Sequence, residues 1–290
     1  ILMKTNVANS RTIGEKVLYT VLIVVFSLYS VSLLFPLFWA ILVSLKTHEE
    51  YMINSPFALP EQWVFKNYLT AFSTLEVNGA TFPGMIVNSL WYAVGSCVLN
   101  IFVCSMTAYI FARYEFKGSR VIYNVLLIIM LMPIIGNGPA IYRVYSRLHI
   151  TNSPFFLIST AGGIGINFLY QEAFYRNVSW SYAEAAFIDG ANHWTVFFRI
   201  MMPQTLGIVS TLGIMQFIQY WNDYSTPMLY FPELPTLALG LYQYEIKMIR
   251  GANMPVYFAG LVLSMLPVLI IFAFCQNSIM ERVALGGIKG

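Results

Sequence analysis

Long runs of apolar residues, uninterrupted by Asp, Glu, Lys or Arg, alternate with shorter polar segments along this chain. A hydrocarbon core about 30 Å thick requires roughly 20 apolar residues in helical form. The pattern therefore predicts six membrane-spanning helices, the longer of which tilt or extend beyond the bilayer. They cover Val17 to Leu45, Phe82 to Ala112, Val121 to Tyr142, Thr151 to Gln171, Met201 to Asn222 and Ala252 to Met280. The expected fold class is all-α, that of a polytopic membrane protein.

The composition supports lipid as the natural solvent, because 58% of the residues are hydrophobic and only 10% are charged. Soluble domains carry about 25% charged residues. A net charge of +3, without any basic cluster that contains aromatic residues, argues against a nucleic-acid-binding protein. Cys97, Cys104 and Cys275 lie in apolar runs, so we expect small buried thiols and no disulfide framework.

The distribution of basic residues predicts the orientation. With six crossings, ten Lys and Arg residues fall on the side of the two termini and six on the opposite side. The positive-inside rule then places both termini in the cytoplasm and makes Lys46 to Ala80 and Asp223 to Gly251 the large external loops. The segment 4–16 is too polar for a cleaved signal peptide, so the first apolar run is expected to remain as an anchor.

No acid or base lies within the predicted spans, which argues against a transporter that runs on protons or sodium. The sequence also lacks the phosphate-binding loop and the paired-histidine zinc motif. His48, His149 and His193 fall in three different loops. We therefore expect no catalytic residue, metal or cofactor in this chain, and any ATP chemistry must belong to a partner.

The segment between the fourth and fifth predicted spans is patterned. Ala-rich Ser181 to Asp189 favours a helix, Gly190 suits a left-handed position after it, and Asn192 is a good N-cap for a second helix. Trp194 and Phe197 give this second helix an apolar face, and Pro203 is expected to mark the transition to span five. A short helix of this type can lie in a groove on another protein.

This segment, EAAFIDGANHWTVFFRIMMP, resembles the EAA loop of binding-protein-dependent ABC importer permeases. The family's pattern is E-A-A, three residues, G, nine residues, I-x-L-P, and here Met202 replaces the usual Leu. Ser179 stands where the family usually has Pro and Ser181 where it often has Glu, so the first helix is expected to begin less sharply. The resemblance assigns ATPase coupling to Glu184, Ala185, Ala186, Asp189, Gly190, Trp194, Phe197 and Pro203.

The resemblance covers nearly the whole chain and points to the carbohydrate-importing branch, where the chain is similar to the maltose-type second permease. Its further marks are Trp39 with Ser44 to Lys46, the pair Asn67 and Tyr68, the run Asn88 to Leu90, the segment Ala108 to Gly118, the pair Trp221 and Asn222, and Gly287 to Gly290.

The resemblance implies a MetI-like permease fold and an inner-membrane location in a bacterium or archaeon. The implied domains are a cytoplasmic segment 1–16, one transmembrane domain 17–280 that includes the coupling loop 172–205, and a cytoplasmic tail 281–290. The implied partners are a second permease subunit in a heterodimer, a pair of ATPase subunits that hold ATP and Mg, and an extracytoplasmic solute-binding protein. The implied substrate is a sugar or an oligosaccharide.

Neutral polar residues at membrane depth are candidates for the solute path, because they are costly there unless they face a cavity or a neighbouring helix. The path candidates are Asn88, Asn137, Gln219, Tyr220, Trp221 and Asn222, with Asn167 and Gln216 as further amides. Trp221 beside Asn222 and Tyr220 near Gln219 combine an aromatic face with an amide, as a sugar site requires. For each residue alone, hydrogen bonding between helices remains an alternative. Close helix packing is preferred to a ligand site for Gly162, Gly163 and Gly165.

Other functions remain open at this point. The chain could transport a non-sugar solute by the same mechanism. A membrane-embedded enzyme would need clustered His, Asp or Cys at membrane depth, which the sequence does not offer. The EAA pattern argues against a structural or receptor-like membrane protein.

Overall fold

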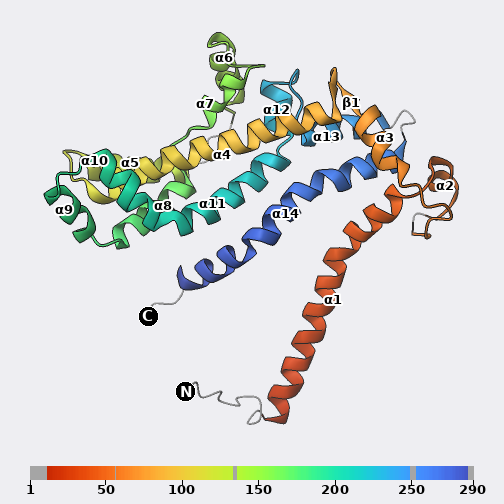
Figure 1. Cartoon of the computed structure of the whole chain (residues 1–290), viewed down its shortest axis with the longest axis horizontal. Helices are drawn as coiled ribbons and strands as arrows, with labels where there is room; N and C mark the ends of the chain where they lie inside the picture. Colours follow the sequence, from red (N-terminus) through yellow and green to blue (C-terminus); the bar gives the residue numbers. More distant parts are fainter. Residues whose placement is uncertain (1–11, 56, 133–135, 249–252, 287–290) are drawn as a thin grey trace. The chain divides into compact units, whose positions relative to one another are not determined.

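A computed structural model describes residues 12–55, 57–132, 136–248 and 253–286 (Figure 1). The chain divides into two compact units. One holds residues up to 71 together with 252–263, and the other holds 72–251 together with the remainder from 264.

The first unit is built around α1 (Ile13–Ser44), which begins with a capping box between Thr12 and Glu15. α2 (His48–Ile53) and the start of α3 (Lys66–Thr74) follow it. The Asn67 amide donates hydrogen bonds of 2.8 Å to the carbonyls of Ser44 and Lys46, and the Tyr68 hydroxyl lies 2.7 Å from the Ser44 hydroxyl. The Asn–Tyr pair singled out in the sequence therefore fixes the end of α1 against α3.

The second unit is centred on α4 (Phe82–Arg113), against which α8 (Ile166–Asn177) and α11 (Met202–Asn222) pack (Figure 1). A small antiparallel hairpin of β1 (Glu76–Val77) and β2 (Ala80–Thr81) precedes α4, with Glu76 opposite Thr81. The other elements of this part of the chain are α5 (Ser119–Leu131), α6 (Gly138–Arg147), η2 (Pro154–Phe156), α7 (Leu157–Thr160), α9 (Ser181–Ile188), α10 (His193–Thr195), η3 (Val196–Met201), α12 (Ser225–Tyr230), α13 (Leu237–Met248) and α14 (Met254–Gly286).

Among the described residues, four helices are long and apolar enough to cross a membrane: Ile13–Ser44, Phe82–Arg113, His193–Asn222 and Met254–Gln276. They confirm the first, second, fifth and sixth predicted spans, and the number of crossings stays a prediction. The three thiols are free, as expected.

The third and fourth predicted spans are not single helices, and that part of the prediction is wrong. In 121–142, α5 ends at Leu131, Met132 is extended, Gly136 has a φ of +85°, and α6 begins at Gly138. In 151–171, η2 and α7 are followed by an unwound segment, 161–165, before α8. Gly136 supplies the left-handed conformation in the first of these segments, where a side chain with a Cβ would be strained.

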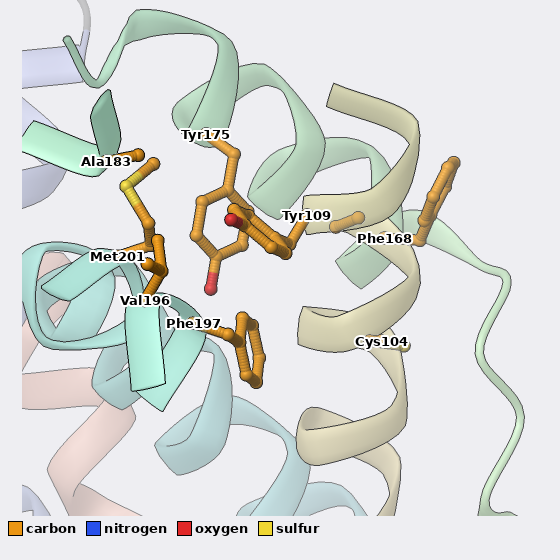
Figure 2. Packing of buried hydrophobic residues seen from close by; sticks show 9 residues of the cluster. Cys104, Tyr109, Phe168, Tyr175, Ala183, Val196, Phe197 and Met201 are labelled. Carbon is orange, nitrogen blue, oxygen red and sulfur yellow. The ribbon is translucent and has the colours of Figure 1, made fainter. Parts of the chain in front are cut away.

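A cluster of buried apolar side chains lies where α9 and η3 meet α4 and α8 (Figure 2). Phe168 and Tyr175 come from α8, Phe197 and Met201 from η3, and all four are buried. The rest of this cluster, here called the loop core, is Cys104, Ala108, Tyr109, Ala183 and Val196.

Candidate functional site: a coupling loop and a polar cavity

The helix α9 (Ser181–Ile188) confirms the Ala-rich helix predicted for the EAA segment. Its first residues carry no side-chain cap, and the Ser179 and Ser181 hydroxyls instead lie 2.7 Å from each other. Ala183 is fully buried in the loop core, where only a small side chain fits against the neighbouring helices. The helix is therefore held by packing more than by capping.

The turn after α9 has the predicted geometry. Gly190 has a φ of +86°, its amide donates to the Phe187 carbonyl at 3.0 Å, and the Ala191 amide donates to the Ala186 carbonyl at 2.9 Å. The Asn192 side chain then caps the next helix by accepting from the Thr195 amide at 2.8 Å. Both the left-handed glycine and the N-cap are confirmed.

Pro203 marks the transition to the fifth predicted span, as expected, because it occupies the first turn of α11. The helix runs without interruption from His193 to Asn222, through the π-helical segment η3 and into α11. A wider π turn before a proline leaves room for the residue that cannot donate its own hydrogen bond, so the helix continues past Pro203.

The coupling residues predicted from the sequence fall into an exposed and a buried group. Glu184, Ala185 and Asp189 are exposed, and Trp194 is 59% exposed. Phe197 is 3% exposed and belongs to the loop core. Phe197 is thus a packing residue of this chain, and Trp194 remains the aromatic candidate for contact with a partner.

Aromatic and basic side chains fix the loop to the end of α4. The Tyr114 hydroxyl lies 2.8 Å from Nδ1 of His193, and the His193 ring meets Phe187 edge-on at 5.0 Å between centroids. The Arg113 guanidinium donates to the Val178 carbonyl and lies 5.6 Å above the Trp180 ring. Both helices of the loop are therefore attached to the same end of α4.

A buried trio of hydroxyls connects the loop core to the spans. The Tyr175 hydroxyl, on α8, lies 2.7 Å from the Ser105 hydroxyl of α4 and accepts a 3.3 Å hydrogen bond from Thr205 of α11. All three side chains are fully buried. Tyr175 thus gives α8 a polar contact with both α4 and α11.

A cavity of about 440 Å³ lies farther along α8, between α4, α11 and the unwound segment 161–165. Four amide side chains line it, one from α4, one from α8 and two from α11. They are Asn100, Asn167, Gln216 and Gln219.

Asn100 organises the wall of this cavity. Its Nδ2 donates to the carbonyls of Thr160 and Gly162 at 3.0 and 3.1 Å, and its Oδ1 accepts from Asn167. The backbone carbonyls that the unwound segment leaves without helical partners are thereby satisfied from α4. The Gln216 Oε1 is buried without a hydrogen-bond partner and is available to a polar ligand.

The glycines beside the cavity play two roles. A Cβ at Gly163 would lie 2.7 Å from Oγ1 of Thr107, which confirms the predicted close packing at this position. Gly162 and Gly165 have open space where a Cβ would project, and both line the cavity, so packing does not account for them.

Of these four amides, Gln219, Gln216 and Asn167 were predicted from the sequence as polar residues at membrane depth, and Asn100 was not. Asn100 satisfies the same criterion, a neutral amide within an apolar run, and that signal could have found it. Gln219 is exposed at the cavity. Tyr220, which was paired with Gln219 as a candidate sugar site, instead packs edge-on against Tyr92, with 5.5 Å between the ring centroids.

The remaining path candidates lie elsewhere. Trp221 is 3% exposed and its indole donates to the Ser264 carbonyl at 3.0 Å, so its ring is not a platform for a solute. Asn88 donates to the Pro235 carbonyl and accepts from Trp91. Asn222 bonds the Ile218 carbonyl of its own helix, and Asn137 is exposed before α6. None of these four lines the cavity.

Asp223 stabilises the end of α11 opposite the loop. Burial of its carboxylate would raise its pKa, but hydrogen bonds from the side chain and backbone of Thr226, from Ser225 and from Tyr92 outweigh that effect. The pKa of Asp223 therefore lies below its ordinary value, and the group carries a charge at neutral pH.

Comparison with known proteins places this architecture in a large group of transport subunits. Residues 101–284 match the family described as binding-protein-dependent transport system inner membrane component. The chain is 28% identical to the diacetylchitobiose uptake system permease protein of Streptomyces coelicolor, over 89% of this chain and 85% of that protein. It is 30% identical to the arabinooligosaccharides transport system permease protein of Bacillus subtilis, over 91% and 94%.

The fold is also similar to a solved structure. A chain in the crystal structure of a bacterial ABC transporter involved in the import of the acidic polysaccharide alginate superposes with a TM-score of 0.78. The match covers 92% of this chain and 98% of that chain, at 18% identity. At that identity the likeness shows the fold alone.

Proposed function

This chain belongs to the family of binding-protein-dependent transport system inner membrane components, and from that premise we propose that it forms half of the solute path of an ATP-driven sugar importer. It is a multi-pass permease subunit of an ABC transporter, and the ATPase belongs to partner chains. The observation that carries the proposal is the course of α8: its first half lines the cavity with Asn167 and Tyr170, and its second half enters the loop core with Tyr175.

The proposed substrate is a neutral, hydroxyl-rich solute such as an oligosaccharide. Amide groups both donate and accept hydrogen bonds, as sugar hydroxyls do, and the cavity lining includes no charged residue. The relatives named above carry the names of carbohydrate uptake systems. A non-sugar solute is the second candidate, because amides also bind other neutral polar molecules.

The proposed assembly contains a pair of ATPases, a second permease that completes a heterodimer, and a solute-binding protein on the outer face. ATP and Mg bind to the ATPases. Both termini of this chain are cytoplasmic, which places the segment Glu184 to Pro203 where an ATPase reaches it. Exposed Glu184 and Trp194 then meet the ATPase, and its rotation reaches the cavity through α8 and the buried hydroxyls.

The test is ATP-dependent uptake by the complete importer in proteoliposomes. Labelled neutral oligosaccharides are compared with an amino acid and with inorganic phosphate. Accumulation of an oligosaccharide that stops when ATP is withheld is expected. Uptake of the amino acid or phosphate alone would replace the proposed substrate class, and uptake independent of ATP would contradict the coupled mechanism.

A further inference from the structure

The helix α6 (Gly138–Arg147) belongs to none of the four apolar helices long enough to span the membrane. It carries Arg143 and Arg147, which are four residues apart and therefore lie on one face. Both side chains are exposed, and neither guanidinium makes an ion pair or a hydrogen bond within the part of the chain that the structure describes. α6 thus presents a doubly positive face with no acid of its own to neutralise it.

A hollow of about 390 Å³ adjoins these charges. Gly138, Pro139, Tyr142 and Arg143 of α6 line it on one side, and Leu229 of α12 lines it on the other. Tyr142 and Leu229 are 41% and 48% exposed. An apolar hollow bordered by tyrosine and arginine has the composition of the residues that dominate protein–protein affinity.

Aromatic contacts connect α6 to α12 and η2. Tyr142 stacks on Tyr230 at 6.1 Å between ring centroids, and Tyr145 contacts Tyr230 at 5.3 Å and Phe156 at 5.8 Å. The Asn152 amide donates to the Tyr230 carbonyl at 2.9 Å. A surface that is already ordered loses little entropy when a partner binds, and affinity rises accordingly.

We propose that α6 and this hollow form a docking surface for an acidic, partly apolar face of the solute-binding protein. This rests on the proposed function and on the predicted topology, in which the chain from Arg143 onward, after the third predicted span, lies on the outer side of the membrane. Basic residues are depleted on that side, so two unpaired arginines on one external helix depart from the general trend. Opposite charges on the two proteins would accelerate their encounter, and the contact would weaken as salt rises.

The experiment measures ATP hydrolysis by the complete importer in nanodiscs while its solute-binding protein is titrated. For the double variant R143E/R147E, the concentration of binding protein that gives half-maximal stimulation is expected to rise about tenfold or more. Hydrolysis at saturating binding protein should remain unchanged. The wild-type value should rise steeply with salt, and the variant's value should not.

Three further variants separate the effect of charge on α6 from the effects of apolar contact and of charge reversal elsewhere. R143K/R147K keeps the charge and should stay close to wild type, and Tyr142→Ala should weaken binding by loss of apolar contact without altering the salt dependence. Lys66→Glu is the control for charge reversal, because it reverses one basic charge at another exposed position, outside α6 and predicted to be external, and it should have no effect.

Each contrary result has a distinct meaning. Unchanged stimulation of R143E/R147E would overturn the docking surface and leave the importer assignment in place. Loss of the second permease from the purified complex, or an effect that depends on anionic lipid in the nanodisc, would assign α6 to that subunit or to the membrane and also overturn the proposal. A wild-type complex that no binding protein stimulates would instead refute the proposed function.

Discussion

The two ends of α8 differ in how they are packed. Around Tyr175 the helix is surrounded by aromatic side chains and by hydroxyls that satisfy one another. Around Asn167 it meets an unwound segment, a cavity and the side-chain oxygen of Gln216, which has no hydrogen-bond partner. A close-packed region transmits displacement because it has no room to deform, whereas a cavity wall of amides and glycines can rearrange around a ligand. In the proposed importer, the end of α8 near Tyr175 would receive the motion of the ATPase, and the end near Asn167 would contact the solute.

The largest effect is expected at Gly190. In the proposed importer, its turn presents the coupling loop, at the close-packed end of α8, to the ATPase. Gly190→Val should abolish uptake while the permease still inserts, because a β-branched residue is strongly disfavoured at a φ of +86°. Association with the ATPase should be lost, or ATP hydrolysis should continue without solute. Co-purification and proteoliposome uptake measure the two outcomes.

The matched control is Gly190→Asn, because asparagine tolerates the left-handed conformation. It should retain most of the uptake. Normal uptake by Gly190→Val at normal membrane levels would show that this turn does not couple the subunits.

A smaller effect is expected from the buried hydroxyls. Tyr175→Phe leaves the Ser105 hydroxyl without its partner and should lower the free energy of unfolding by about 1–3 kcal/mol. Thermal unfolding of the purified importer measures the loss. Tyr175→Phe combined with Ser105→Ala should cost less than the sum of the single changes, because no unpaired group remains. Strict additivity would mean that the two hydroxyls do not stabilise each other.

At the cavity end, Gln219→Ala should raise the solute concentration for half-maximal uptake about fivefold, the equivalent of one hydrogen bond of roughly 1 kcal/mol. Trp221→Ala should instead reduce the amount of folded permease, since it empties a buried position. Uptake titrations normalised to membrane level separate the two effects. If Gln219→Ala leaves the titration unchanged and Trp221→Ala shifts it, the solute path follows Trp221 and Asn222, the aromatic and amide pair predicted from the sequence, and not the cavity.

The smallest functional effect is expected from substitutions that only report the orientation of the two ends. Cysteine at Glu61 or Glu233 should react with an impermeant maleimide added to intact cells, and cysteine at Gly118 should not. Uptake should be close to wild type in all three. Labelling at position 118 would place the coupling loop on the outer face and contradict the assignment of the packed end to the ATPase.

Local signals in the sequence predicted the parts of the site that depend on neighbouring residues. The left-handed Gly190 and the capping Asn192 follow from residue types within one turn of the chain, and both were found. The break at 161–165 depends on Asn100, which is distant in sequence and satisfies carbonyls that a helix would otherwise need to pair. Apolar length alone cannot detect such a break, so a continuous span was expected.

Side-chain direction was the second quantity that the sequence did not determine. Trp221 and Gln219 are near neighbours on α11, yet one is buried against Phe217 and the other reaches the cavity. Burial of the Trp221 indole depends on contact with Ser264, in another helix.

The resemblance predicted at the end of the chain, Gly287 to Gly290, lies outside the described residues.

The π-helical segment η3 sets the angular phase between the loop and the cavity. Each residue of a regular helix advances the chain by about 100° around the axis. The wider π turn between Val196 and Met201 absorbs one extra residue, so Trp194 and Gln219 keep nearly the angular relation that a regular helix one residue shorter would give them. A further residue inserted there, with no turn to absorb it, would rotate the loop by about 100° relative to the cavity.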